Sequence, residues 1–291
     1  MSVLIKQLYL ILAFFLVIPL CASAGDTIIG GKTTVAAKKG ESLSLIGARF
    51  GVDWQIIAKD NGFDPKKVCC IGQEFTINNL RIVPKIIHDG IIVNVPDRML
   101  YFFQDGMLIK AFPVGLGLPQ KEWQTPIGPF SIVLKTTNPT WYVPKSIQKE
   151  MAKKGQVVKT IVPPGKDNPL GRYAIRTTME SVLIHETIWP TTIYQWRSHG
   201  CIRVSPEVME GFFDQVKIGM TGEIVYKPAS IAVRENRVFL QVAKNIYKRT
   251  AYIDTEIRTM VEERGLSDKV DWIKVQDVMK KKTGIAEDVT L

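Results

Sequence analysis

The chain has 291 residues, of which 46% are hydrophobic and 23% are charged, and its formal net charge is +10. This composition excludes disordered and fibrous proteins, and the length allows more than one domain. A basic protein fits an anionic envelope polymer as its partner, whereas no zinc-finger spacing, arginine-rich arm or aromatic RNA-binding signature indicates nucleic acid.

The first segment has the features of an export signal. Residues 8–20 form a nearly uninterrupted apolar run that is too short for a comfortable membrane span. The run follows Lys6 and precedes Ala22-Ser23-Ala24, a small-residue cleavage site. We therefore expect residues 1–24 to be a cleaved signal peptide and the mature protein to lack a stable membrane span.

Three cysteines remain after this cleavage, namely Cys69, Cys70 and Cys201. An oxidising compartment favours an even, paired set, so at least one thiol should stay free. A bond between the neighbours Cys69 and Cys70 would be strained, and we expect both to be semi-buried small apolar residues. The cysteine without a disulfide partner is the first indication of a reactive site.

Residues 33–84 predict a compact unit of a strand, two helices and a returning strand. An apolar pattern through Leu43 and Phe50 predicts a helix that stops near Gly51. A second short helix fits residues 53–59, and residues 71–77 alternate like a strand.

From Gly90 onward the pattern changes to short apolar runs separated by Gly and Pro. The predicted strands are residues 91–95, 99–103, 107–114, 129–134 and 173–177. Closely spaced strands with such breaks favour a sandwich or barrel over a parallel α/β fold. A helix is predicted at residues 146–154.

The C-terminal residues 229–291 predict a hairpin that turns at Glu235-Asn236, followed by two amphipathic helices. The helices fit residues 253–264 and 269–282, with Ser267 as the N-cap of the second and Gly284 as its stop. The mixed charge of this region indicates an ordinary solvated surface.

The most specific string of the chain is residues 198–203, Ser-His-Gly-Cys-Ile-Arg, with His185 upstream. A thiolate attacks carbonyl carbons, and a nearby imidazole can generate it and later return the proton. This predicts Cys201 as a nucleophile with a lowered pKa. Two histidines and one cysteine lack a fourth well-placed ligand, which argues against a metal site. His88 is expected to be a solvated structural residue.

Two resemblances cover most of the chain. Residues 40–62 together with residues 71–77 resemble a LysM module, a small fold that binds N-acetylglucosamine-containing glycans. Residues 90–227 resemble the YkuD-type L,D-transpeptidases of the periplasmic ErfK/YbiS-like branch. The matching strings are TPIGPF (125–130), NPTWYVP (138–144), VPPGKDNPLGRYAIR (162–176), LIH (183–185) and SHGCIR (198–203).

The resemblance implies a mainly β catalytic domain of the L,D-transpeptidase β-sandwich type, a small α+β LysM-like module at 33–84 and a partly helical C-terminal extension at 229–291. It implies Cys201 as the nucleophile and His185 as proton donor and acceptor. Ser198, His199, Gly200, Arg203 and Glu186 would shape the site.

Several positions of this predicted site leave alternatives open. In the family an oxygen of the residue after the base orients it, and Glu186 stands here where glycine or serine is common. Backbone N–H groups near Gly200 and Cys201 could form an oxyanion hole. Arg203 could bind a substrate carboxylate or a protein carbonyl. Residues 189–197 replace the usual Asn- and Gly-rich loop. Three tryptophans are candidates to line the cleft, namely Trp141, Trp189 and Trp196.

The expected activity is transfer of a peptidoglycan stem tetrapeptide in the periplasm, without metal or cofactor. Cys201 would form a thioester and expel the terminal D-alanine, and an amine would resolve it. The acceptor could be another stem, giving a 3→3 cross-link, or a lysine of an envelope lipoprotein. Water would make the protein a carboxypeptidase or cross-link hydrolase. A catalytically silent protein that binds stem peptides and glycan strands is the alternative from another class.

Overall fold

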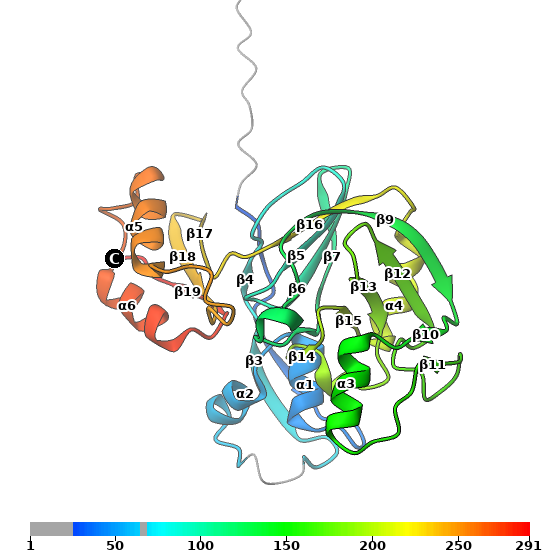
Figure 1. The fold of residues 1–291 in the computed structure, drawn as a ribbon. Coiled ribbons are helices and arrows are strands. Elements are labelled where there is room, and N and C mark those ends of the chain that lie inside the picture. Colours follow the sequence, from blue (N-terminus) through cyan, green and yellow to red (C-terminus); the bar gives the residue numbers. More distant parts are fainter. Residues whose placement is uncertain (1–25, 65–68) are drawn as a thin grey trace, which may run out of the picture.

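The computed structural model describes residues 26–64 and 69–291. It contains an N-terminal unit, a large β unit and a C-terminal unit, which Figure 1 shows in blue to cyan, in cyan-green to yellow, and in gold to red. The predicted signal peptide lies outside the described residues. No helix in the described part of the chain is long and apolar enough to cross a membrane.

The N-terminal unit has the predicted order of strand, helix, helix and strand. Its elements are β2 (Lys32–Ala36), α1 (Leu43–Phe50), α2 (Trp54–Asp60) and β3 (Glu74–Asn78). The Ser42 side chain caps α1, and Gly51 ends it in the left-handed conformation that favours glycine. The Asn61 side chain bonds both backbone groups of Thr76 and so joins the end of α2 to β3.

The large unit is built on one eight-stranded sheet. Its strands are β5 (Gly90–Asn94), β6 (Met99–Gln104), β7 (Met107–Pro113), β9 (Gly128–Thr137), β12 (Tyr173–Thr177), β13 (Leu183–Glu186), β15 (Ile202–Val204) and β16 (Thr221–Val225). The order is β15-β13-β12-β9-β16-β5-β6-β7. Strand β9 pairs with β16 at one end and with β12 at the other, so it joins the two halves.

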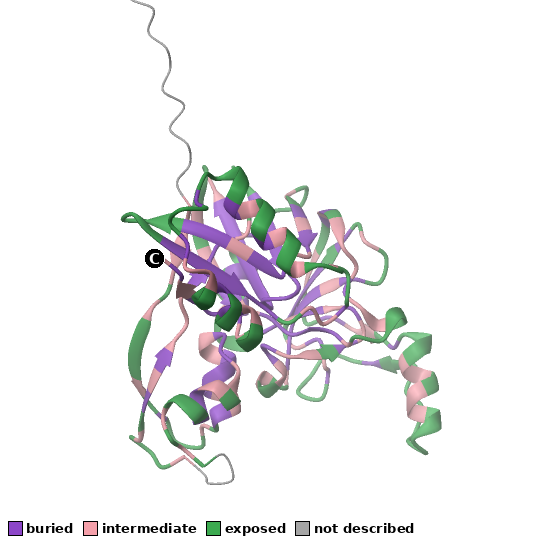
Figure 2. Cartoon of the chain, turned by 90° about the vertical axis from the view of Figure 1, so that its left-hand side faces the viewer, coloured by how far each residue is buried: buried purple, intermediate pink, exposed green. Residues whose placement is uncertain are grey.

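Both halves of the sheet share one core. Leu100 and Phe102 of β6 pack in the same buried cluster as Ile184 of β13 and Ile202 of β15. Helix α4 (Pro206–Gln215) adds Met209 and Phe212 to this cluster, and Figure 2 shows the buried strands in purple. The expected mainly β fold is confirmed, with its halves hydrogen-bonded into a single mixed sheet.

Shorter elements surround the sheet. They are β1 (Ile28–Ile29), β4 (Arg81–Ile82), β8 (Leu116–Gly117), η1 (Lys121–Trp123), β10 (Trp141–Tyr142), α3 (Lys145–Lys153), β11 (Ile161–Val162), η2 (Pro190–Thr192) and β14 (Trp196–Ser198). Strands β8 and β14 run parallel as a separate pair. This pair leads directly into the residues around Cys201.

The C-terminal unit contains the predicted hairpin and two helices. Its elements are β17 (Ala229–Arg234), β18 (Arg237–Val242), α5 (Ile253–Glu263), α6 (Trp272–Lys281) and β19 (Ala286–Asp288). Glu235 and Asn236 both adopt positive φ at the hairpin turn. The expectation of a second helix from residue 269 with Ser267 as its cap is wrong, because the Asp271 side chain caps the N–H groups of Ile273 and Lys274 instead.

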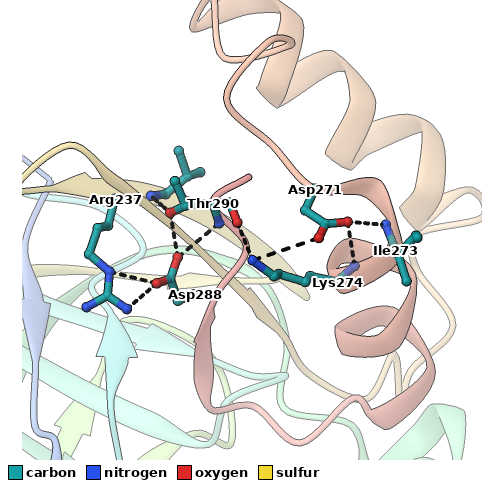
Figure 3. A network of polar contacts seen from close by, with 7 residues as sticks. Arg237, Asp271, Ile273, Lys274, Asp288 and Thr290 are labelled. Carbon is teal, nitrogen blue, oxygen red and sulfur yellow. Dashed lines mark hydrogen bonds and ion pairs between the residues drawn. The ribbon is translucent and has the colours of Figure 1, made fainter.

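A polar network fastens the chain end to this unit (Figure 3). The Asp288 carboxylate accepts from Arg237 of β18 at 2.6 Å and from the backbone N–H of Thr290 at 2.9 Å. Lys274 of α6 donates to the Thr290 carbonyl. The last strand, the hairpin and α6 are therefore held by the same few residues.

The N-terminal and large units meet through buried arginines. Arg98, which is 4% exposed, donates to Asp53 at the start of α2 at 3.1 Å and to the Tyr194 carbonyl at 2.9 Å. Arg81 donates to the Gly51 carbonyl and to the Tyr194 hydroxyl. Burial acts to raise the pKa of Asp53, but Arg98 and Lys244 outweigh it and the net pKa is lowered.

Asp53→Ala should destabilise this joint, because it leaves the buried Arg98 guanidinium without its carboxylate. We expect the free energy of unfolding to fall by about 2–5 kcal/mol, measured by urea denaturation. Asp60→Ala, an exposed carboxylate on the same helix, is the matched control and should leave stability nearly unchanged. Equal effects of the two changes would contradict the account of the joint.

Candidate active site

Cys201 lies in the short connection between β14 and β15. The buried Ser198 side chain closes this connection, since its hydroxyl donates to the Cys201 carbonyl at 2.6 Å and accepts from the Gly200 N–H at 3.2 Å. Gly200 has φ +107°, a conformation that side chains rarely adopt. The glycine and the serine together shape the backbone that carries the thiol.

The pairing of β13 with β15 brings the predicted base to the strand that directly follows the cysteine. These strands run parallel, with His185 opposite Arg203. Cys201 directly precedes β15 and lies two residues before Arg203. Because side chains alternate between faces along a strand, we expect the Cys201 side chain on the face that Arg203 and His185 share. The positive charge of Arg203 acts on both side chains, since it favours the thiolate of Cys201 and disfavours the imidazolium of His185.

The hydrogen bond of His185 identifies its basic nitrogen. Nδ1 lies 2.6 Å from the Glu186 carbonyl oxygen. A carbonyl oxygen only accepts, so Nδ1 carries the proton and Nε2 holds the free lone pair. Burial lowers the pKa of His185 to about 4, with a further contribution from Arg203. The imidazole is therefore neutral near pH 7.

The Cys201 thiol is also neutral in this structure. Its Sγ lies 3.6 Å from the Ser181 carbonyl oxygen, a geometry in which the thiol donates. Burial raises the pKa of Cys201 above its usual value, and this effect exceeds the opposing effects of the Leu183 backbone N–H and of the Arg203 charge. The expectation of a lowered thiol pKa is thus wrong, because removal from water disfavours the thiolate more than these two groups favour it.

The Glu186 side chain belongs to the opposite face of β13 from His185, because neighbouring residues of a strand alternate between faces. Gly171 makes room for this side chain, since a Cβ there would lie 2.7 Å from the Glu186 Cβ. The backbone N–H of Arg172 bonds the carboxylate, whose pKa burial nevertheless raises. The main-chain oxygen of Glu186 is the atom that hydrogen-bonds to His185.

His199 contacts two residues that sequence reasoning missed. Its Nε2 lies 2.8 Å from the Glu150 carboxylate on α3, and its ring packs edge-on against Trp123. Burial lowers the pKa of His199, while Glu150 opposes that shift. Glu150 is 49 residues away in sequence, and no local pattern marks it as a partner. His199 therefore anchors α3 beside the cysteine loop.

Residues 189–197 divide their contacts between the site and the N-terminal unit. The Arg203 guanidinium lies 5.7 Å from the Trp189 ring centroid. Trp196 instead stacks on Arg98, with 4.2 Å between the guanidinium carbon and the ring centroid, so it lies at the joint between units. Trp141 is placed on β10, opposite Val162 of β11.

The predicted oxyanion donors differ in availability. The Gly200 N–H is already bonded to the Ser198 hydroxyl. Among the described residues, the Cys201 N–H has no hydrogen-bond partner. A developing negative oxygen near the sulfur could therefore use the Cys201 N–H but not the Gly200 N–H.

The backbone of residues 114–118 forms hydrogen bonds along both of its edges with the residues that flank Cys201. Gly115 exchanges two bonds with Arg203, at 2.9 and 2.8 Å, and the Leu118 N–H donates to the Ser198 carbonyl. Gly117 donates to the Thr125 hydroxyl at 2.9 Å. This segment, named the 114–118 segment here, joins both ends of the cysteine loop.

Tyr247 of the C-terminal region completes this support. Its buried hydroxyl donates to the Gly117 carbonyl at 2.7 Å and accepts from the Thr125 N–H at 3.1 Å. Tyr247 packs in the core of the large unit rather than in that of the C-terminal unit. No local signal identifies it, because Gly117 is 130 residues away in sequence.

The other predicted reactive residues lie apart from Cys201. Cys69 packs half-buried in the N-terminal core, whereas Cys70 is exposed, so the expectation of a semi-buried Cys70 is wrong. His88 is exposed and pairs with Asp89. Within residues 26–64 and 69–291, no group of three or more His, Cys, Asp or Glu side chains could hold a metal ion.

Comparisons with known proteins place these features in a family. Residues 88–228 match the YkuD L,D-transpeptidase catalytic domain, and residues 37–78 match the LysM domain. The chain belongs to the YkuD-type L,D-transpeptidases. It is 25% identical to "Probable L,D-transpeptidase ErfK/SrfK" of Salmonella typhimurium, covering 91% of this chain and 89% of that protein.

Two further relatives of this L,D-transpeptidase come from Escherichia coli. "Probable L,D-transpeptidase YcfS" is 26% identical, covering 91% of this chain and 86% of that protein. "Probable L,D-transpeptidase ErfK/SrfK" is 32% identical, covering 67% of this chain and 59% of that protein.

Glu186→Gln should leave the pH dependence of acylation by this L,D-transpeptidase unchanged, because the main-chain oxygen contacts His185. We expect kcat/KM within about twofold of the wild type and an acidic limb with its midpoint near pH 4, where His185 gains its proton. Release of D-alanine measured across pH 3–8 checks this. A limb displaced to lower pH would assign the carboxylate a role in tuning the base.

Tyr247→Phe should lower kcat more than it changes KM, since it leaves the Gly117 carbonyl and the Thr125 N–H buried without their partner. We expect kcat to fall roughly tenfold, the equivalent of about 1.4 kcal/mol. Tyr101→Phe is the matched control, because it removes a buried hydroxyl bonded to Asp97 at 2.8 Å. Comparable loss of stability in both variants, with kcat lowered only in the first, is the expected pattern.

Proposed function

We propose that this protein is an exported peptidoglycan L,D-transpeptidase that works in the periplasm, with Cys201 as nucleophile and His185 as general base and acid. One observation carries the proposal. The β13–β15 register, with His185 opposite Arg203 and Cys201 directly before β15, supports the pairing of thiol and imidazole, and the bond to Glu186 leaves Nε2 of His185 as the basic nitrogen.

The first half-reaction starts from two neutral groups. The Cys201 Sγ attacks the carbonyl carbon after the third residue of a stem tetrapeptide, and its proton moves to Nε2 of His185. The carbonyl oxygen becomes negative and accepts from the Cys201 N–H. When the C–N bond breaks, His185 gives its proton to the departing D-alanine amine, and a thioester remains on Cys201.

The second half-reaction reverses these roles. The acceptor amine attacks the thioester carbon and loses a proton to Nε2 of His185. The C–S bond then breaks, and the sulfur recovers that proton. The imidazolium exists only during transfer, because burial and the Arg203 charge disfavour it and only the Glu186 carbonyl supports it.

The surrounding residues position these groups. Ser198 and Gly200 shape the cysteine loop, and His199 with Glu150 holds α3 beside it. Arg203, whose pKa burial lowers, carries a positive charge that acts on the sulfur and can attract the terminal carboxylate of the stem. Glu186 contributes its main-chain oxygen.

Peptidoglycan stem peptides and glycan strands are the proposed partners, in line with the catalytic and LysM domains. The acceptor amine belongs to a second stem or to an envelope lipoprotein. Hydrolysis of the same thioester by water gives a carboxypeptidase or cross-link hydrolase.

Cys201→Ala should abolish D-alanine release from a disaccharide tetrapeptide, because no other side chain forms the thioester. The double variant Cys69→Ser with Cys70→Ser is the control and should keep turnover, since both residues lie in the N-terminal unit. Mass spectrometry of the wild-type products with added stem and lipoprotein acceptors identifies the acceptor.

Two other outcomes of these experiments would contradict the proposed function. Turnover that survives Cys201→Ala would exclude this cysteine as the nucleophile. Binding of intact sacculi without any product from the wild type would identify a silent wall-binding protein instead.

A further inference from the structure

A groove of about 190 Å³ lies on the face of the large sheet that carries the candidate catalytic pair. It is lined by Leu134 of β9, by Ala174 and Arg176 of β12, and by Leu183 of β13. The strand register places Arg176 between Leu134 and Leu183 in one row across the sheet. Ile175 belongs to the other face and packs in the core. The volume suits one long side chain rather than a whole ligand.

The groove begins at the groups that would carry the reaction. Ala174 lies directly opposite His185 on the neighbouring strand, where facing Cβ atoms are about 5 Å apart. The backbone N–H of Leu183 bonds to the Cys201 sulfur. Arg176 lies opposite Leu183 one strand further on, so two strand spacings, about 10 Å, separate it from the cysteine backbone. The groove therefore leads from the sulfur across β13 to β12.

The lining suits an aliphatic chain that ends in a negative charge. Leu134 and Tyr142 are 45% and 71% exposed, and exposed apolar side chains that gather in one place mark binding sites. Arg176 is the one charged residue of the lining. Its side chain is exposed and has no hydrogen bond or ion pair within the described part of the chain. The guanidinium is thus available to a carboxylate of the substrate.

The arrangement around His185 indicates which part of the substrate faces the groove. His185 exchanges a proton with the departing amine and with the acceptor amine, so both must come within hydrogen-bond reach of it. Arg203, opposite His185 on β15, can attract the carboxylate beside the departing amine. The groove lies on the other side of His185, over β12. The acyl part of the donor therefore faces the groove, with the side chain of its third residue nearest to the sulfur.

We propose that Arg176 determines specificity for the donor stem, by binding a carboxylate at the end of an aliphatic side chain on the third residue. The inference rests on the proposed function and adds to it the chemistry of the donor. Contacts with Leu134 and Leu183 remove the aliphatic part from water. The charge-assisted hydrogen bonds of Arg176 then favour a terminal carboxylate. A stem with a neutral end at this position loses that interaction.

Calorimetric titration of Cys201→Ala with two matched probes tests the proposal without turnover. Both probes are N-acetylated tetrapeptides that end in D-alanine and have no free amine, so neither can serve as an acceptor. The third residue is α-aminopimelate in one probe and its side-chain carboxamide in the other. We expect the carboxylate probe to bind about three- to tenfold more tightly, as for a partly exposed charge pair.

In the same background, Arg176→Gln should bring the ratio of the two dissociation constants toward one, mainly by weakening the carboxylate probe. Arg176→Lys keeps the charge but not the bidentate geometry, so it should give an intermediate ratio. Leu134→Ala removes apolar surface that both probes share and should weaken both by a similar factor. Arg234→Gln is the control, because Arg234 is an exposed arginine of the C-terminal hairpin, and it should preserve the ratio.

Equal affinity of the parent for the two probes overturns the proposal. A ratio that survives Arg176→Gln also overturns it, since the carboxylate then binds elsewhere. If Arg176→Gln lowers transfer to an amine acceptor while both probes bind unchanged, the groove belongs to the acceptor and the proposal is likewise wrong. Failure of the proposed function is seen separately, as absence of D-alanine release by the wild-type protein from a disaccharide tetrapeptide.

Discussion

Hydrogen bonds along both edges of the 114–118 segment hold the candidate site together. Along one edge, Leu116 and Leu118 hydrogen-bond to Gln195 and Ser198, which precede Cys201 in the chain. Along the other edge, Gly115 hydrogen-bonds to Arg203 of β15, which follows Cys201. Both glycines of the segment are required by close contacts. A Cβ at Gly115 would lie 2.7 Å from the Thr192 carbonyl oxygen, and a Cβ at Gly117 would lie 2.1 Å from the Trp123 carbonyl oxygen. The position of the sulfur is therefore determined by main chain on either side rather than by its own contacts.

Burial makes the candidate catalytic pair electrically neutral. Desolvation disfavours the imidazolium and the thiolate alike, and Arg203 adds a fixed positive charge that favours only the thiolate. Such a site suppresses reaction of the resting thiol with solvent oxidants, because the thiolate is the reactive form. Negative charge on sulfur then develops when a carbonyl carbon is present to accept it.

Sequence patterns single out His185 and Cys201 as candidates because both lie in short strings of chemically unusual composition. Short apolar runs separated by Gly and Pro likewise indicated β5, β6, β7, β9 and β12 of the large sheet. The contacts of Glu150 and Tyr247 could not be predicted, since each joins segments far apart in the chain and uses a residue type common on any surface. The direction of the Cys201 pKa depends on burial, which local sequence does not report.

The end of the chain has a consequence for the order of folding. Ile285 packs in the core of the LysM domain, and the Ala286 N–H donates to the Leu80 carbonyl at 2.8 Å. The LysM domain therefore lacks a core side chain until residue 285 has been synthesised. Contacts of such long sequence separation form late and slowly. The core of the LysM domain is thus completed by the C-terminal unit, whose residues are made long after its own.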